Sequence, residues 1–223
     1  MCNHYRQAIL KGETIPGWSI DQFSEIKVPL RFHNMTRDVY PDREGLVIRL
    51  QDGKPAIEAM RWGFPPPPAA NAVYVTNVRN TKSGFWKPWL KEAHRCLVPV
   101  SQFAEPDPEK PKPRAERWFA TPDGAPMFFA GIWREWDGDR GPKSKPVAGP
   151  HLLFSFLTTE PNAVVAPIHP KAMPVIISPE DAQTWLTAPI AEALELQRPA
   201  PVEAITLLAR EATLSRRRGS RRS

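Results

Sequence analysis

The sequence of 223 residues predicts one β-rich α+β domain whose strands come from several hairpins. Two Asp-Gly pairs, Asp52-Gly53 and Asp123-Gly124, each lie between apolar runs, and this pattern is typical of a β-hairpin. The 27 prolines separate aromatic and aliphatic runs along the whole chain. They therefore indicate many irregular connections within a folded domain rather than disorder.

The first half of the chain predicts mainly extended structure. In order, we expect an extended segment at Leu30, Phe32 and Met35, a hairpin of strands 45–51 and 55–62, a polyproline turn at 65–68 and a short strand at 74–76. Apolar and β-branched residues before and after the Asp-Gly turn are the reason for predicting the hairpin.

The second half mixes strands with short helices. In order, we expect a helix at 84–93, a buried strand at 96–100, an exposed charged loop at 105–114, a hairpin of strands 117–120 and 126–133, a loop at 137–150, a strand at 152–158 and helices at 178–186 and 190–197. The first of the last two helices has a clear start signal, because Ser178 is a good N-cap and Pro179 suits the first helical position.

Composition limits the classes of protein that the chain can belong to. Hydrophobic residues make up 41% of the sequence, enough for a sizeable core, and no run of 18 apolar residues predicts a membrane span. The N-terminus lacks the apolar segment of a secretory signal. The two cysteines form no disulfide framework. We therefore expect a cytoplasmic protein.

The formal charge of +6 is concentrated at the C-terminus, since five arginines lie between residues 216 and 222 and leave +1 for residues 1–215. We divide the chain into a domain at 1–210 and a basic tail at 211–223. Such a tail either binds nucleic acid without specificity or is a solvated, disordered end, and the second interpretation is favoured for tails of this kind.

The first six residues, MCNHYR, carry distinctive chemistry. Because Cys2 is small, removal of Met1 is favoured, which would leave the Cys2 thiol next to a free α-amine. The amine condenses with an aldehyde to an imine, and the thiol then adds to the same carbon to close a thiazolidine ring. The alternative is that position 2 is an arbitrary residue of a frayed terminus.

Two residues are candidate proton carriers. Glu105 ends an apolar segment, where partial desolvation would raise its pKa towards the range of a general acid or base. His169 follows another apolar segment and titrates near neutral pH. Each has a structural alternative, since Glu105 is one of 24 acids and a lone histidine more often caps a turn.

Residues 76–95 combine positive charge with aromatic rings, with five basic residues and a single acid. Positive charges follow phosphates and aromatic faces stack on bases, so Arg79, Lys82 and Trp86 are candidate contacts to single-stranded DNA. Trp62, before a glycine at the end of a predicted strand, is a second candidate for stacking. For both tryptophans, packing in the core is the alternative.

Several other kinds of site are not indicated. The two cysteines lie far apart, and the sequence has neither a His-x-His nor a Cys-x-x-Cys pair, so we expect no metal site. A glycine-rich phosphate loop and a serine-hydrolase elbow are also missing from the sequence. We therefore expect no cofactor.

A set of motifs in one order resembles the SRAP family, named for SOS-response-associated peptidases. The motifs are Cys2, Arg61-Trp62-Gly63, Asn77-x-Arg79, the strand ending at Glu105, Phe129-Ala130-Gly131-Ile132-Trp133, and Ile168-His169 before Met173-Pro174. The resemblance extends from residue 2 to about residue 187. It implies a curved, barrel-like sheet with a positively charged groove for single-stranded DNA, and action on abasic sites.

The resemblance also implies a covalent mechanism. Met1 is removed autocatalytically, and Cys2 forms a thiazolidine with the ring-opened aldehyde of an abasic deoxyribose. Asn77 orients the N-terminus and the sugar, Glu105 is the acid or base near the Cys2 amine, and His169 protonates sugar oxygens.

DNA contacts follow from the same resemblance. Arg79 grips a phosphate and Trp62 stacks near the lesion. Where the family usually has Gly-Arg after the cysteine, this chain has Asn3-His4, so that His4 or Arg6 must take the place of the arginine. Lys171 replaces a further arginine. The expected partner is single-stranded DNA with abasic sites, bound by a monomer that contacts no membrane.

Three functions remain open from the sequence. The first is covalent capture of abasic sites in single-stranded DNA. The second is a thiol peptidase that uses Cys2 and His169 on other proteins, although no oxyanion-hole signature accompanies them. The third is a single-stranded-DNA-binding module in which Cys2 is incidental. Replacing Cys2 with alanine separates the three functions. It should abolish crosslinking under the first, abolish proteolysis under the second and change nothing under the third.

Overall fold

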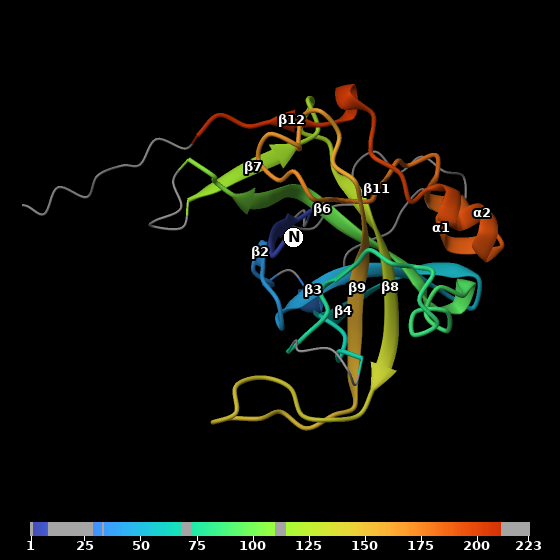
Figure 1. Ribbon diagram of the computed structural model, residues 1–223. Coiled ribbons are helices and arrows are strands. Elements are labelled where there is room, and N and C mark those ends of the chain that lie inside the picture. Colours follow the sequence, from blue (N-terminus) through green and yellow to red (C-terminus); the bar gives the residue numbers. More distant parts are fainter. Residues whose placement is uncertain (1, 9–28, 33, 68–72, 110–114, 211–223) are drawn as a thin grey trace, which may run out of the picture.

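A computed structural model describes residues 2–8, 29–32, 34–67, 73–109 and 115–210 of the chain. Within these residues the fold is β-rich with a few short helices (Figure 1). The strands are β1 His4–Gln7, β2 Asp38–Val39, β3 Glu44–Gln51, β4 Lys54–Trp62, β5 Asn77–Val78, β6 Arg95–Pro106, β7 Glu116–Ala120, β8 Met127–Trp136, β9 His151–Thr159, β10 Met173–Pro174, β11 Ile176–Ile177 and β12 Thr206–Leu207. The helices are α1 Ala182–Thr187 and α2 Ile190–Glu195, with 3₁₀-helices at Leu30–Phe32, Glu92–His94 and Val202–Ala204.

Five strands close into a barrel. Strand β8 is antiparallel to both β9 and β6, β9 is parallel to β4, β4 is antiparallel to β3, and β3 returns to β6 where Ile48 lies opposite Leu97. The other strands extend this ring, with β1 and β7 on the C-terminal half of β6 and β5 beside β9. Closure satisfies backbone groups that an open sheet would expose at its edges.

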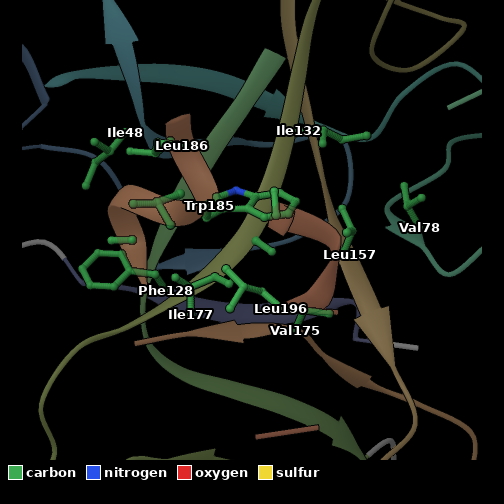
Figure 2. Packing of buried hydrophobic residues seen from close by; sticks show 14 of the residues in the cluster. Ile48, Val78, Phe128, Ile132, Leu157, Val175, Ile177, Trp185, Leu186 and Leu196 are labelled. Carbon is green, nitrogen blue, oxygen red and sulfur yellow. The ribbon is translucent and has the colours of Figure 1, made fainter. Parts of the chain in front are cut away.

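The long strand β6 separates two hydrophobic clusters, because its successive side chains point to opposite faces. Leu97 belongs to a cluster centred on Trp185 of α1, which Figure 2 shows surrounded by aliphatic side chains from the barrel strands. Val98 belongs to the other cluster, which includes Trp62 and Phe129. Both faces of the first half of β6 are therefore buried.

Helices α1 and α2 pack together on one side of the barrel (Figure 1). The indole N–H of Trp185 donates to the Cys96 carbonyl at 2.8 Å, which fixes α1 to β6. Both helices are six residues long, and no helix in the described residues has the length and apolarity needed to cross a membrane.

An ion pair holds the connection between β4 and β5. The buried Arg140 guanidinium donates to the Asp42 carboxylate at 2.9 Å and to the Gly63 carbonyl at 2.8 Å. The Tyr74 hydroxyl donates to the same carboxylate at 3.2 Å. These bonds fix the chain shortly before Asn77, the first residue of β5.

Much of the predicted extended structure is confirmed. The first hairpin is present as β3 and β4, joined by a turn in which Asp52 has φ of 52° and Gly53 has φ of 74°. Positive φ at both central residues is the geometry of a type I′ turn. The strand predicted at 96–100 is part of β6, the one at 152–158 is β9, and residues 137–150 form a loop as expected.

The predicted second hairpin is wrong. Strands β7 and β8 flank Asp123-Gly124, but they do not pair with each other, since both lie antiparallel to β6. Strand β7 takes the C-terminal half of β6 and β8 takes the N-terminal half. Because β6 is twelve residues long, β7 and β8 can each pair with a different part of it.

Local predictions also need correction. Residues 84–93 form turns and the 3₁₀-helix Glu92–His94, because Pro88 has no amide hydrogen to continue an α-helix. Leu30–Phe32 is a 3₁₀-helix rather than an extended segment. The strand expected at 74–76 is displaced to β5, and only Val75 bridges Phe64.

The remaining boundaries shift by a few residues. The expected helices at 178–186 and 190–197 are α1 and α2, and Ser178 accepts a hydrogen bond from the Asp181 amide at 3.2 Å before α1 begins. The loop expected to begin at 105 begins after Pro106, the last residue of β6. Pro68, residues 110–114 and the predicted tail at 211–223 lie outside the described residues.

Candidate functional site around Cys2

Cys2 lies just before β1, which runs antiparallel to the C-terminal half of β6 with His4 opposite Ala104. The register brings the start of the chain to Glu105. The Cys2 side chain is buried, and its thiol donates to the His4 carbonyl at 3.4 Å. Burial raises the pKa of the thiol well above its usual value, and the negative charge of Glu105 adds to the effect.

Asn77 connects β5 to the start of the chain. Its amide nitrogen donates to the Cys2 carbonyl at 3.0 Å and to the Thr76 hydroxyl at 2.8 Å. The side-chain oxygen is buried and has no hydrogen-bond partner within the described residues. Asn77 therefore holds the Cys2 backbone while one acceptor next to it remains available.

Glu105 is a nearly inaccessible carboxyl, 1% exposed, on the second-to-last residue of β6. Burial raises its pKa to about 7, against the opposing effect of the positive N-terminal amine. A carboxyl with that pKa is partly protonated and partly ionised at neutral pH. It can therefore both accept and donate a proton.

His169 lies in a turn that follows β9. Its Nδ1 is 2.8 Å from the Ala172 carbonyl and accepts a hydrogen bond from the Ala172 amide at 3.2 Å, an arrangement that leaves the hydrogen of a neutral ring on Nε2. Partial burial lowers the pKa of the imidazole, and the charges of the N-terminal amine and Lys171 lower it further. The charge of the same amine also lowers the pKa of Glu105, so it affects both candidate proton carriers.

The structure thus brings four sequence-predicted residues to one place. Cys2 comes from the chain start, Asn77 from β5, Glu105 from β6 and His169 from the turn after β9. The Cys2 thiol, a carboxyl whose pKa is about 7 and a histidine whose pKa is lowered by burial form a set that suits nucleophilic chemistry on an electrophilic carbon. The described residues contain no group of three or more potential metal ligands.

His4 and Arg6 are engaged with protein groups instead of being exposed for DNA. The His4 ring nitrogens lie 2.8 Å from Glu116 and 3.0 Å from Asp38, and the ring stacks on Tyr40. Arg6 donates to Asp38 at 3.1 Å. Both side chains tie β1 to its neighbours.

The stacking roles expected for two tryptophans need correction. Trp62 is completely buried, and its indole N–H donates to the Thr76 carbonyl at 3.0 Å. Trp86 is 7% exposed and packs against Phe64. Neither ring offers a face to a DNA base, so core packing is the correct interpretation for both. Trp62 instead fixes the residue that precedes Asn77.

Arg79 and Lys82 are available at the surface. Lys82 is exposed, and the Arg79 guanidinium, 48% exposed, pairs at 3.1 Å with Glu160, which is itself 62% exposed. Exposed pairs of this kind contribute at most about 1 kcal/mol. A phosphate could therefore replace Glu160 as the partner of Arg79 at low cost.

Sequence reasoning did not find Tyr5 and Thr76, which complete the surroundings of the site. The buried Tyr5 hydroxyl has no hydrogen-bond partner among the described residues and lies against Gly45. Thr76 receives hydrogen bonds from both Trp62 and Asn77. No local signal marks either residue, because their partners lie far away in the sequence.

A large pocket lies elsewhere in the fold. It has a volume of about 890 Å³ and is lined by residues from segments 121–127, 176–181 and 196–204. None of the four residues at the Cys2 site lines it. Its walls are mostly apolar, and it plays no part in the chemistry described above.

Known proteins resemble the chain in sequence and in fold. A family model described as SOS response associated peptidase (SRAP) matches residues 1–212. A crystal structure from Bordetella bronchiseptica has 21% identity and a TM-score of 0.66, over 93% of this chain and 100% of that one. A phage-related protein from the same organism has 20% identity and a TM-score of 0.67, over 93% of each chain.

A third structure, from Bacteroides thetaiotaomicron, has 18% identity and a TM-score of 0.65, over 92% of this chain and 90% of that one. These likenesses show a shared fold. No curated protein matches the chain.

Proposed function

The chain belongs to the SRAP family, whose name associates it with the response to DNA damage, and from this premise we propose that it captures abasic sites in single-stranded DNA through Cys2. Removal of Met1 exposes the α-amine of Cys2. The amine and the thiol then join the ring-opened aldehyde of the abasic sugar in a thiazolidine. The product is a covalent link between protein and DNA.

The observation that carries the proposal is the convergence of Asn77, Glu105 and His169 on the start of the chain. Asn77 holds the Cys2 carbonyl, and the charge of the N-terminal amine affects the pKa values of the other two. An incidental terminal cysteine would need none of these neighbours. Removal of Met1 would leave the Cys2 amine on a residue that Asn77 holds by its carbonyl, beside a proton carrier, as condensation with an aldehyde requires.

The reaction divides into two bond-forming steps. The Cys2 amine attacks the aldehyde carbon, and the carbonyl oxygen leaves as water when the imine forms. Glu105 accepts a proton from the amine and returns it to the leaving hydroxyl, while His169 supplies a proton to the sugar oxygen as the ring opens. The thiol sulfur then adds to the imine carbon, and its proton passes to nitrogen.

Removal of Met1 uses the same groups. Hydrolysis of the bond between Met1 and Cys2 consumes one water and releases methionine with a free Cys2 amine. Asn77 holds the Cys2 carbonyl at 3.0 Å during this step, and Glu105 is the proton carrier. The peptidase activity is therefore directed at the chain itself.

Intact-protein mass spectrometry tests the proposal. The purified protein is weighed before and after incubation with a single-stranded oligonucleotide that carries one abasic site. We expect loss of one methionine, then a heat-stable adduct whose mass equals protein plus oligonucleotide less one water. Cys2→Ala should form no heat-stable adduct.

Two further variants sharpen the result. Cys2→Ser keeps the amine, so it should give an imine that survives heating only after reduction with borohydride. Cys96→Ala removes the other thiol, which is fully buried, and should form the adduct like the wild type. A wild type that binds the oligonucleotide without an adduct would favour a non-covalent binding module, and cleavage of other proteins lost in Cys2→Ala would favour a thiol peptidase.

A further inference from the structure

Arg117 lies beside the Cys2 site on a strand that no motif singled out. In the β6–β7 pair, Arg117 is directly opposite Glu105, and Phe119 is opposite Phe103. Side chains two residues apart on a strand point to the same face. The rings of Phe103 and Phe119 stack at 5.0 Å, so Arg117 and Glu105 share the face on which those rings meet.

The described residues supply no hydrogen-bond acceptor for the Nε of Arg117. This nitrogen is buried, and no ion pair to Arg117 occurs within the same residues. Arg6 and Arg79, by contrast, each pair with an acid. Within the described residues Arg117 therefore has a buried N–H donor without an acceptor and a guanidinium without an ion-pair partner.

Asp107, the acid whose pKa responds to the charge of Arg117, already has other hydrogen-bond partners. Burial would raise the pKa of Asp107, but hydrogen bonds from the Glu109 amide and Arg210 hold it below its usual range, with a smaller contribution from the charge of Arg117. Arg210 donates to the Asp107 carboxylate at 3.1 Å. Asp107 is thus paired with Arg210. Arg117 remains available to an external anion.

A half-buried charge without a partner costs stability, and an anion that binds there recovers that cost. The planar guanidinium offers two parallel N–H groups, which match two oxygens of a phosphate. Cross-strand neighbours have Cβ atoms about 5 Å apart, so a phosphate on Arg117 would lie next to the sugar that Glu105 serves.

We infer that Arg117 is a DNA-binding residue that holds a backbone phosphate next to the abasic sugar. This inference rests on the proposed function and adds a contact from β7. It also accounts for the missing arginine at position 4, because His4 and Arg6 are tied to Asp38 while Arg117 is open. Together, Arg117 on β7 and Arg79 after β5 would hold the DNA strand from two separate elements.

Equilibrium binding tests the inference separately from the chemistry. The probe is a fluorescent single-stranded oligonucleotide with one tetrahydrofuran site, an abasic analogue without an aldehyde, titrated by anisotropy at several salt concentrations. Arg117→Gln should bind about tenfold more weakly, because a hydrogen-bonded contact between two charged groups is lost. The slope of log affinity against log salt should fall by about 0.7, the value for one phosphate on a single strand.

Two variants complete the design. Arg117→Lys keeps the charge but not the paired N–H groups, so it should keep the salt slope and bind with intermediate affinity. Arg49→Gln is the matched control, since Arg49 already pairs with Glu58 beside the other half of β6, and it should bind like the wild type. Thermal unfolding midpoints confirm that each variant is folded.

The outcomes separate the two proposals. Wild-type affinity and salt slope in both Arg117 variants would overturn the inference, whatever the protein does covalently. Equal losses in Arg117→Gln and Arg49→Gln would also overturn it, because the effect would then be one of overall charge. A reduced slope in Arg117→Gln, in a protein whose wild type forms no adduct with a true abasic site, would support the phosphate contact while rejecting the covalent function.

Discussion

Glu105 combines deep burial with a position at the end of a strand, and the combination sets its pKa to about 7. We expect Glu105→Gln to slow both Met1 removal and adduct formation about 100-fold, the size usual for loss of a general acid or base. Rates measured from pH 5 to 8.5 should change slope near pH 7 in the wild type and lose that inflection in the variant. Unchanged rates would remove Glu105 from the mechanism.

His4 has a structural role in this fold. Its two ring nitrogens lie 2.8 Å from a Glu116 carboxylate oxygen and 3.0 Å from an Asp38 carboxylate oxygen, so the ring links β1 to two neighbouring segments. We expect His4→Leu to lower the free energy of unfolding by about 1–2 kcal/mol, because two partly exposed carboxylates lose a partner. Urea denaturation measures the change.

The neighbouring exposed residue provides the control for His4. Asn3→Leu adds the same side chain next to the site and should leave the unfolding free energy within about 0.5 kcal/mol of the wild type. If His4→Leu were as stable as Asn3→Leu but lost DNA affinity with a shallower salt dependence, the ring would be a phosphate contact after all.

The identity of the candidate site residues could be predicted from the sequence, but their surroundings could not. Taken singly, Cys2, Glu105 and His169 each have a structural alternative, and the ordered set of motifs is what selects them. The burial of Trp62 and the pairing of His4 depend on Thr76, Asp38 and Glu116, which are distant in the sequence. Only the paired strands bring them together, and a local pattern contains no information on that pairing.

At the scale of elements, the same Asp-Gly signal gave one correct and one wrong prediction. The turn at Asp52-Gly53 joins two strands of similar length that pair along their whole extent. The strands that flank Asp123-Gly124, β7 and β8, both pair with β6 instead of with each other. The twelve residues of β6 are enough to pair with both strands, one at each end. Turn residues predict where the chain changes direction. Which strands pair depends on the other strands available in the sheet.

Gly53 tests how far the first hairpin depends on its turn. Its φ of 74° is a conformation that favours glycine, and nothing lies within 4 Å of an added Cβ. We expect Gly53→Ala to lower the free energy of unfolding by about 1 kcal/mol through backbone strain alone. Urea denaturation measures this change as well.

Gly84 is the matched control for Gly53. It also has open space around an added Cβ, but its φ lies outside the left-handed region. Gly84→Ala should therefore be neutral or slightly stabilising, because alanine reduces the freedom of the unfolded chain. Equal destabilisation by both substitutions would show that the strain at Gly53 is not the cause.

At the scale of the whole molecule, the strands added to the barrel produce the environment of Glu105. Strand β6 pairs with β1 and β7 along its C-terminal half, while its N-terminal half belongs to the barrel. A residue between two paired neighbours is shielded from water on both sides. The raised pKa of Glu105 is thus a property of the fold, and it has a cost in stability.

That cost predicts how stability depends on pH. The folded state holds the Glu105 proton up to about pH 7, whereas the unfolded chain releases it near its ordinary value of 4.5. Between these two values the folded state binds more protons, so the free energy of unfolding contributed by this group falls as pH rises. We expect Glu105→Gln to match the wild type near pH 4 and to exceed it by about 1–3 kcal/mol at pH 8.

Urea denaturation across this range measures the difference, in preparations whose N-terminal residue has been matched by intact mass. Glu203→Gln, at an exposed position, should show no such growth of stability with pH. If Glu105→Gln gained nothing at pH 8, the ionised carboxylate would be fully compensated by the N-terminal amine, and burial would not be the origin of its reactivity. A gain combined with slower chemistry would show that the fold gives up stability to keep a proton carrier at the site.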